Sequence, residues 1–220
     1  HGVEALRGID FEICRGETFA LLGPNGAGKS TTIEILEGYR DRSSGQVSVL
    51  GIDPQRGGLD WKARLGIVLQ SGGEQGNATV REQLTHFAGF YPNPRSVDEV
   101  IEAVGLESKA TSRIKLLSGG QRRRVDVALG IIGRPELLFL DEPTTGLHPS
   151  DVERLIAQLN GLVESGNTVI VVEHDMRVAA ASDWVIDMGP GAGIHGGRVM
   201  AQGTFAEVQA NPDSLTGKYL

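Results

Sequence analysis

Nine consecutive residues near the start of the chain contain the eight-residue pattern G-x-x-x-x-G-K-[ST]. They are Gly23, Pro24, Asn25, Gly26, Ala27, Gly28, Lys29, Ser30 and Thr31. The glycines let backbone N–H groups face a phosphate chain, and the helix expected to follow adds the positive end of its dipole. Lys29 can reach the β- and γ-phosphates, and the Ser30 hydroxyl can ligate Mg²⁺. The motif therefore predicts a binding site for a nucleoside triphosphate and Mg²⁺, although a plain Gly-rich turn before a helix is the alternative.

Polar side chains follow three strand-like apolar runs, over residues 65–69, 137–140 and 168–172. Gln70 follows the first, Asp141 and Glu142 the second, and His174 lies just past the third. The carboxyl ends of parallel strands meet at the ligand crevice of an open α/β sheet. We expect Asp141 and Gln70 to hold Mg²⁺ together with Ser30, and Glu142 to polarise the attacking water. We expect His174 to contact the γ-phosphate. Each residue also has a plainer interpretation. Asp141 and Glu142 can be a simple charge pair at a strand end, Gln70 can be a solvated loop amide, and His174 can be a surface histidine.

Four further residues, Ser118, Gly119, Gly120 and Gln121, begin a helix-like run. They can act as a helix cap alone, or the capped helix N-terminus can serve as a second anion site. One phosphate chain can hardly fill two such sites in the same molecule. We therefore expect the second site to serve a nucleotide bound to another subunit.

Apolar strands alternating with helices predict an α/β fold with a mainly parallel sheet. Polar–apolar alternation over residues 3–22 and the run 46–50 predict a small antiparallel β subdomain. Helical periodicity between residues 79 and 132 predicts a helical subdomain. We expect one domain over 1–220, with an ATP-binding core formed by 1–71 and 136–220 and a helical subdomain over 72–135. Further expected elements are a helix over 149–164, a hairpin over 196–203 and a short helix over 204–210.

Composition narrows the class of protein. The 220 residues carry a net charge of −7, which argues against a nucleic-acid-binding domain driven by a basic surface. Cys14 is the single cysteine, so no intramolecular disulfide and no Cys-rich zinc site is expected. No apolar run approaches the roughly 20 residues of a membrane span, and no secretory leader is visible. The chain starts at His1 without an initiator Met, which we interpret as a sign of an excised or processed segment.

In this order, the motifs resemble the nucleotide-binding domain of the ABC ATPase superfamily, and Leu117–Gln121 matches its signature. The resemblance implies two ATP molecules held in a head-to-tail dimer, formed by two copies or by a paired ABC subunit. Each phosphate loop would face Ser118–Gly120 of the partner, with Glu142 as catalytic base and His174 as switch histidine. It further implies hydrolysis of ATP to ADP and phosphate, a membrane-spanning partner, and a cytoplasmic location at the inner face of the cell membrane.

The two parts of the chain resemble different branches of this superfamily. Residues 1–147 resemble the ATP-binding subunits of multidrug exporters, whereas residues 146–220 resemble the carboxyl end of the excinuclease ATPase of nucleotide-excision repair. Three hypotheses follow: an exporter motor, a soluble DNA-repair ATPase, or a natural or engineered chimera. Two features depart from the family pattern: His148 stands where exporters usually carry Asp, and His1 is the nearest candidate for stacking on adenine. The excinuclease ATPase also carries zinc-binding cysteines between its phosphate loop and its signature motif. This chain has no cysteine between those two motifs.

Overall fold

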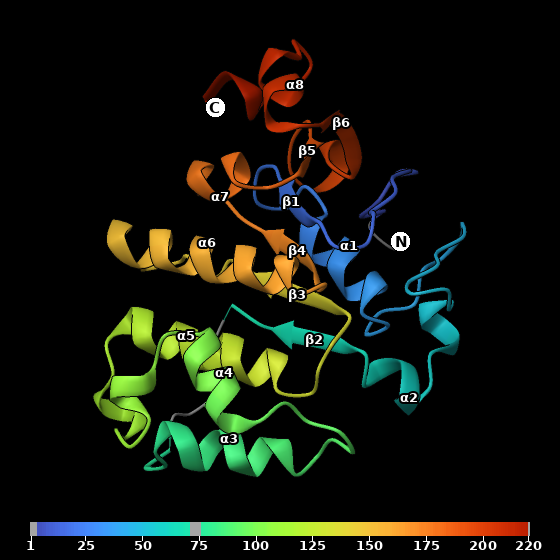
Figure 1. Ribbon diagram of the computed structural model, residues 1–220. Coiled ribbons are helices and arrows are strands. Elements are labelled where there is room, and N and C mark those ends of the chain that lie inside the picture. Colours follow the sequence, from blue (N-terminus) through green and yellow to red (C-terminus); the bar gives the residue numbers. More distant parts are fainter. Residues whose placement is uncertain (1–3, 71–75, 220) are drawn as a thin grey trace.

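A computed structural model describes residues 4–70 and 76–219 (Figure 1). Its six-stranded sheet has the order β2-β3-β4-β1-β5-β6. The strands are β1 (Thr18–Leu22), β2 (Leu65–Val68), β3 (Leu137–Asp141), β4 (Thr168–Val172), β5 (Trp184–Gly189) and β6 (Arg198–Gly203). All neighbouring strands are parallel except β5 and β6, which are antiparallel. The hairpin expected within residues 196–203 is wrong, because this stretch supplies a single strand, β6, whose partner is β5. The predicted α/β class with a mainly parallel sheet is confirmed.

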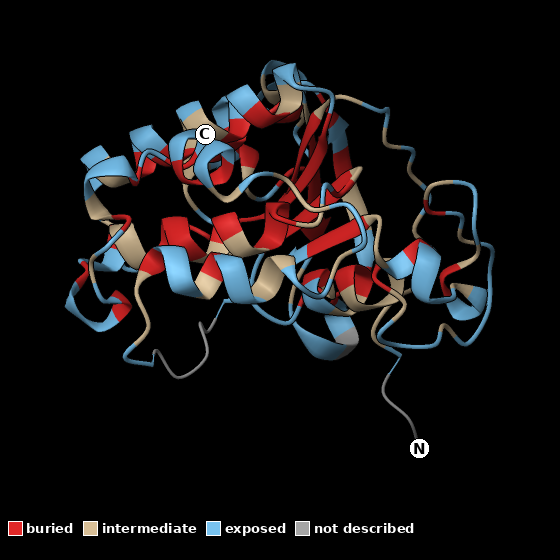
Figure 2. Ribbon diagram, turned by 60° about the horizontal axis from the view of Figure 1, so that its bottom comes forward, coloured by how far each residue is buried: buried red, intermediate tan, exposed pale blue. Residues whose placement is uncertain are grey.

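Alternate residues of the central strands feed two hydrophobic cores on opposite faces of the sheet. In β3, Leu138 and Leu140 join one core, and Leu137 and Phe139 join the other. The first core packs against helix α6 (Pro149–Glu164), and the second packs against helix α1 (Lys29–Leu36). Figure 2 shows the buried strands between helices that expose only their outer faces. Because both faces are covered, the strands read as continuous apolar runs.

Helices α3 (Val80–Ala88), α4 (Val97–Ala103) and α5 (Gly119–Ile131) lie together at the β2 end of the molecule (Figure 1). Helix α8 (Phe205–Ala210) lies at the opposite end, beside β6. Two short helices, α2 (Leu59–Lys62) and α7 (Met176–Ala180), and five 3₁₀ turns complete the described elements. The helix expected over 149–164 has these bounds in the structure. The shorter helix expected over 204–210 begins one residue later, because Thr204 is its cap.

The amino-terminal part differs from the expected β subdomain. Residues 4–17 contain no strand, and residues 46–50 contribute only an isolated bridge between Val49 and Ile52. The polar–apolar alternation of this segment has another cause. Its apolar side chains pack against the second hydrophobic core, the one that also packs against α1; they are Leu6, Ile9, Phe11 and Ile13. The chain lies extended over the core, and Arg7 N donates to Gly197 O at 2.7 Å. One-sided burial therefore produced a strand-like pattern without a ladder of paired backbone. Most of the loop expected near residues 71–76 lies outside the described residues.

Candidate nucleotide-hydrolysis site

The phosphate loop connects β1 to α1, and two of its glycines cannot carry a side chain. Gly23 has φ 130°, and a Cβ there would lie 2.2 Å from the backbone oxygen of Met188. Gly28 is the N-cap of α1 with φ 101°, and a Cβ would lie 2.7 Å from Leu6 Cδ2. Both combine a backbone conformation that favours glycine with close approach of another segment. Pro24, Asn25, Gly26 and Ser30 are exposed, so the rim of the loop is open to a ligand.

Lys29 is the buried cation of this loop. Its side chain is part of a residue only 5% exposed, and Nζ donates to Gly23 O at 2.7 Å and Pro24 O at 3.1 Å. Burial lowers the pKa of Lys29, while the carboxylates of Glu142, Asp141 and Asp187 oppose that shift. A polyanion placed beside the ammonium would offset the cost of its burial. This is a physical fit between the loop and a phosphate chain.

Three of the predicted catalytic side chains meet at Glu142, directly after β3. Glu142 Oε2 accepts from Gln70 Nε2 at 2.6 Å, and Oε1 lies 3.4 Å from His174 Nε2. Thr145 Oγ1 adds a third contact, donating to Oε2 at 3.1 Å. The three loops that follow β2, β3 and β4 thus bring an amide, a carboxylate and an imidazole together. Glu142 itself has φ 44°, an uncommon conformation for a residue with a side chain, of a kind that clusters at functional sites.

Asp141 closes β3 next to this cluster. Burial raises its pKa, and the neighbouring Glu142 raises it further, while Arg123 and Lys29 act in the opposite direction. A divalent cation would favour the ionised form of Asp141 and would therefore oppose the effects of burial and of Glu142. The hydroxyl of Ser30, the amide of Gln70 and the carboxylate of Asp141 are oxygen donors of the kind Mg²⁺ prefers. Within the described residues no group of three His, Cys, Asp or Glu side chains gathers as a metal site.

Arg123 is a residue whose role the sequence did not reveal. It is 7% exposed and projects from α5 into the ends of two strands. Nη1 donates to Leu69 O at 2.6 Å, Nη2 to Asp141 O at 2.7 Å and Nε to Pro143 O at 3.2 Å. One guanidinium therefore fixes the backbone on both sides of the Gln70–Glu142 contact. Three consecutive arginines on one helix point in different directions, and that periodicity was the only available hint that one faces inward.

Glu173 is a second residue that the motif search passed over. Its buried carboxylate accepts from Thr144 N at 2.7 Å through Oε1. Through Oε2 it accepts from His174 N at 2.9 Å and Asp175 N at 3.2 Å. It thereby ties the loop after β3 to the loop that carries His174. A carboxylate placed directly after a fully apolar strand was the signal, because such a group must find buried donors.

The residues Ser118 and Gln121 form a reciprocal capping box at the start of α5. Ser118 Oγ accepts from Gln121 N at 3.2 Å, and Gln121 Oε1 accepts from Ser118 N at 3.0 Å. Ser118 and Gly119 are exposed, and Gly119 shares a cavity of about 250 Å³ with Gln70 and Glu142. Gly120 is buried, and a Cβ there would lie 2.5 Å from Asp151 Cγ. The cap is present, and its use as an anion site remains a prediction.

His148 occupies the N-cap position of α6. Its Nδ1 accepts from Ser150 N at 3.4 Å and lies 2.9 Å from Ser150 Oγ. An imidazole nitrogen can therefore start this helix where exporters usually have Asp. His1, the candidate for adenine stacking, lies outside the described residues.

Residues 6–145 match the family described as "ABC transporter", more than half of the 220-residue chain. The chain belongs to the ABC transporter family. It is an ABC-type ATPase cassette, and the matched segment holds the phosphate loop, Gln70, the 118–121 motif and the Asp141–Glu142 pair. In the part of this cassette that the structure describes, no helix is long and apolar enough to cross a membrane.

Relatives of this ABC cassette differ in their named functions. The cobalt import ATP-binding protein CbiO of Rhodobacter capsulatus is 37% identical over 224 residues, covering 97% of this chain and 78% of that protein. The Nod factor export ATP-binding protein I of Rhizobium meliloti is 39% identical over 180 residues, covering 79% of this chain and 53% of that protein. UvrABC system protein A of Thermus thermophilus is 40% identical over 207 residues, covering 84% of this chain and 21% of that protein. The chain thus spans about half the length of the Nod factor export protein and a smaller part of UvrABC system protein A. Each alignment is longer than the 147-residue front part, so each crosses the junction between the two resemblances.

Solved ABC cassettes share the fold. The structure of cbiO1 from Clostridium perfringens, part of the transporter complex cbiONQ, has a TM-score of 0.83 at 32% identity, covering 95% of this chain and 85% of that one. A dimeric, post-hydrolysis structure of the ATP-binding cassette MJ0796 with ADP and Pi has a TM-score of 0.75 at 25% identity, covering 91% and 90%. The mainly parallel sheet and its nucleotide-binding loops therefore belong to a known architecture.

Proposed function

We propose that this ABC cassette binds ATP with Mg²⁺ and hydrolyses it to ADP and phosphate as the motor subunit of an exporter. The observation that carries the proposal is the convergence of Gln70, Glu142 and His174 beside the buried ammonium of Lys29. Bound Mg²⁺ would neutralise part of the phosphate charge, held by Ser30, Asp141 and Gln70.

In the proposed reaction each side chain has a distinct role. Lys29 and the backbone from Gly23 to Thr31 bind the phosphates of ATP. Glu142 accepts a proton from the attacking water, since its carboxylate is already oriented by three donor-bearing neighbours. His174 lies 3.4 Å from Glu142 Oε1, and the buried Glu173 holds the backbone N–H of His174. Gln70 holds Glu142 through its amide nitrogen and would offer its amide oxygen to Mg²⁺.

The proposed assembly is a head-to-tail dimer of two cassettes, either two copies or a paired ABC subunit. Exposure of Ser118 and Gly119 at the tip of α5 supports a role against the phosphates of a partner's ATP. In this arrangement residues 1–71 and 136–220 form the ATP-binding core, and residues 72–135 form the helical signature subdomain. The dimeric structure of the cassette MJ0796 supports a dimer of cassettes.

The proposed partner is a membrane-spanning permease, which places the cassette in the cytoplasm at the inner face of the cell membrane. Export is the direction proposed, since the Nod factor export ATP-binding protein is a relative over 79% of the chain. The cobalt import ATP-binding protein CbiO of Rhodobacter capsulatus is a relative over 97% of the chain and supports import as the alternative. The net charge of −7 speaks against nucleic acid as the partner. Neither zinc nor DNA enters this proposal.

The ATPase rate measured against protein concentration tests the proposal, in wild type and in Glu142→Gln. An active dimer predicts that the rate per cassette rises with concentration in the wild type and stays near zero in the variant. A rate per cassette that is independent of concentration would contradict the dimer. A rate that is equal in both proteins would contradict the role of Glu142.

The likeness to UvrABC system protein A supports a second candidate, a soluble DNA-repair ATPase module. Duplex-DNA binding at several salt concentrations separates the candidates, because phosphate contacts make binding fall steeply with salt. Salt-sensitive binding to DNA in the presence of ATP would favour this second function. A chimera of the two branches remains a hypothesis, and an uninterrupted genomic reading frame across codons 130–160 in a wild isolate would exclude the engineered version.

A further inference from the structure

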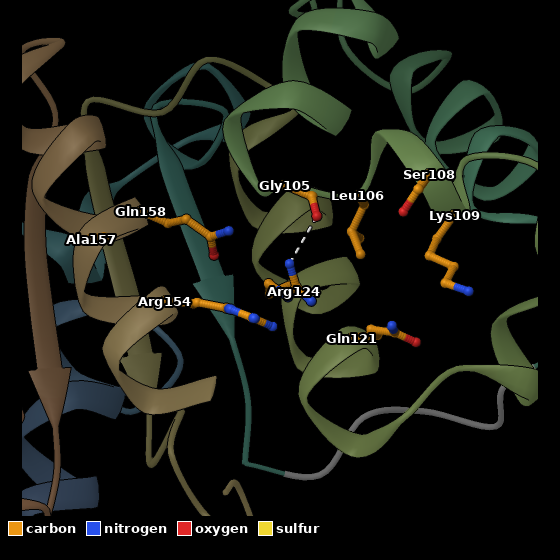
Figure 3. Close-up of a pocket in the computed structure, with 9 residues that line it drawn as sticks. All are labelled: Gly105, Leu106, Ser108, Lys109, Gln121, Arg124, Arg154, Ala157 and Gln158. Carbon is orange, nitrogen blue, oxygen red and sulfur yellow. Dashed lines mark hydrogen bonds between the residues drawn. The ribbon is translucent and has the colours of Figure 1, made fainter. Parts of the chain in front are cut away.

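A second cavity of about 470 Å³ lies between α5, α6 and the segment from Gly105 to Lys109 (Figure 3). Its polar lining comes from Ser108, Lys109, Gln121, Arg124, Arg154 and Gln158. No residue of the phosphate loop lines it, and neither Asp141 nor Glu142 does. The cavity therefore lies apart from the phosphate loop and the Asp141–Glu142 pair, and it shares Gln121 with the motif at the tip of α5. Its volume falls within the roughly 300–1,000 Å³ of small-molecule sites.

Three cationic side chains reach this cavity in a protein whose net charge is −7. In Figure 3 the guanidinium of Arg154 extends from α6 toward Arg124 on α5, and Lys109 lies on the other wall, beyond Leu106, with its ammonium turned away from the arginines. Acidic groups compensate these positive charges only in part. Arg154 Nη1 is 3.8 Å from Asp151 Oδ1. Asp151 and Glu107 attract the guanidinium of Arg124 without a direct contact to it. Two guanidiniums held near each other repel, and an anion between them would remove that repulsion.

Arg124 is the buried cationic residue in the lining of the cavity. The residue is 9% exposed, and Nη1 donates to Gly105 O at 2.8 Å (dashed in Figure 3) and to Val104 O at 3.3 Å. Its Nε is buried with no hydrogen-bond partner among the described residues. Burial lowers the pKa of Arg124, and Arg154 lowers it further. A buried cation with an unused donor is the kind of group that an oxyanion stabilises.

Gln158 supplies a buried acceptor in the same wall. Its Nε2 donates to Val104 O at 2.6 Å, which fixes the orientation of the amide. Its Oε1 is buried and, within the described part of the chain, accepts no hydrogen bond. Because this oxygen is buried, it is not a group that a ligand in the cavity contacts. The polar groups that a ligand can reach are mainly cationic, and they call for several anionic oxygens.

We propose that this cavity binds a small multivalent oxyanion, such as a polycarboxylate or a phosphate monoester. The oxyanion oxygens accept from Lys109, Arg124 and Arg154. Gln121 belongs both to this lining and to the capping box of Ser118, so the ligand would contact the helix that carries the signature motif. Binding of the oxyanion can be tested without nucleotide.

Calorimetric titration of the metal-free, nucleotide-free protein with citrate tests the proposal at low salt. We expect one citrate per chain, and binding that weakens as salt is added. Arg154→Gln and Lys109→Gln should each weaken binding by roughly tenfold, the effect of losing one charge-assisted contact. Arg154 has a side chain 66% exposed, so its substitution leaves the fold intact.

Lys115→Gln and Arg198→Gln are matched controls, because they remove one exposed cation each away from the cavity. Unchanged citrate affinity in both controls supports the site, and an equal loss in all four variants would reduce it to nonspecific charge attraction. Lys29→Gln separates the cavity from the phosphate loop. Binding that is lost in Lys29→Gln but kept in Arg154→Gln and Lys109→Gln would overturn the proposal, as would the absence of any citrate binding.

Discussion

Gln70 Nε2 donates to Glu142 Oε2 across 2.6 Å, although the two residues are 72 positions apart in the chain. Each follows one of two neighbouring parallel strands, β2 and β3. The sheet register therefore creates this contact, and Arg123 holds the backbone just before and just after it. A shift of α5, which carries Arg123, would therefore move the amide of Gln70 and the carboxylate of Glu142 together.

Replacing Glu142 with Gln should lower ATP turnover by roughly 10²–10⁴-fold while ATP binding is retained, because the amide cannot take a proton from water. The substitution keeps the size of the side chain and an oxygen that can accept from Gln70. Phosphate release and nucleotide affinity are the two measurements. Glu164→Gln, which changes an exposed carboxylate at the end of α6, should leave both unchanged. Normal turnover in the Glu142 variant would exclude Glu142 as the base.

Replacing Arg123 with Ala should lower the free energy of unfolding by about 2–4 kcal/mol, because three backbone carbonyls lose a charged donor. It should also lower turnover, since the loops carrying Gln70 and Glu142 lose their common support. Denaturant unfolding and phosphate release are measured in parallel. Arg122→Ala removes the neighbouring, less buried arginine and should change unfolding by less than about 0.5 kcal/mol. Equal effects of both substitutions would contradict a specific role for Arg123.

The sequence predicted the sheet and the ends of its strands well, because covered parallel strands are apolar throughout and their ends carry the polar residues. The phosphate loop, Gln70, Glu142 and His174 could be found in this way. Arg123 and Glu173 could not be assigned a role, since their partners are backbone atoms of segments distant in the chain. A motif search registers side-chain types, and it does not register which carbonyl a guanidinium reaches.

The amino-terminal segment shows a different limit of sequence analysis. Phe11 has the alternating position of a strand residue, yet its ring packs 5.8 Å from the ring of Phe19 without a strand partner beside it. Alternation reports which side of the chain is buried. It does not report whether another strand lies within hydrogen-bonding distance, and that depends on the path of distant segments.

Stability should depend on pH through Glu37 at the end of α1. Burial raises the pKa of Glu37 to about 7 from its ordinary value of 4.5, with Asp141 and Glu34 adding to the shift. The folded state therefore binds the proton more tightly, and this stabilising contribution is present below about pH 4.5 and lost as pH rises through 7. Glu37→Gln should be more stable than wild type by about 1–3 kcal/mol at pH 8 and similar to it near pH 5.

Chemical denaturation at a series of pH values measures this difference. Glu12→Gln, which changes an exposed carboxylate, should follow the wild-type curve. A constant offset between Glu37→Gln and wild type at all pH values would show that packing, and not titration, causes the effect.

ATP at about 100-fold over its Kd should stabilise the folded chain by about 2.7 kcal/mol in the presence of Mg²⁺. Chelating Mg²⁺ with EDTA should reduce this gain, since the phosphate charge then faces Asp141 and Glu142 without a cation. Lys29→Met keeps the buried aliphatic stem and removes the ammonium, and it should lose most of the gain. Thermal unfolding with ATP, with ATP and Mg²⁺, and with EDTA distinguishes these cases. An identical MgATP shift in Lys29→Met would contradict the role of the lysine.

The fully buried carboxylate of Asp187 should decide whether the carboxyl-terminal segment stays attached to the sheet. It accepts from Ser214 Oγ at 2.6 Å, Thr216 N at 3.1 Å and Thr216 Oγ1 at 2.5 Å. Asp187→Ala leaves these donors buried without an acceptor and should lower the free energy of unfolding by about 2–4 kcal/mol. Because the lost contacts all lie in one segment, that segment should open before the rest of the protein.

Limited proteolysis followed by mass measurement detects such opening. Cleavage within residues 211–219 should become faster in Asp187→Ala and stay at the wild-type rate in Asp213→Ala, which changes an exposed carboxylate of the same segment. Asp187→Asn keeps one acceptor oxygen and should fall between the two. If Asp187→Ala were destabilised while its carboxyl-terminal segment resisted cleavage as in wild type, the carboxylate would serve the charge balance around Lys29, on which it also acts, and not the attachment of the segment.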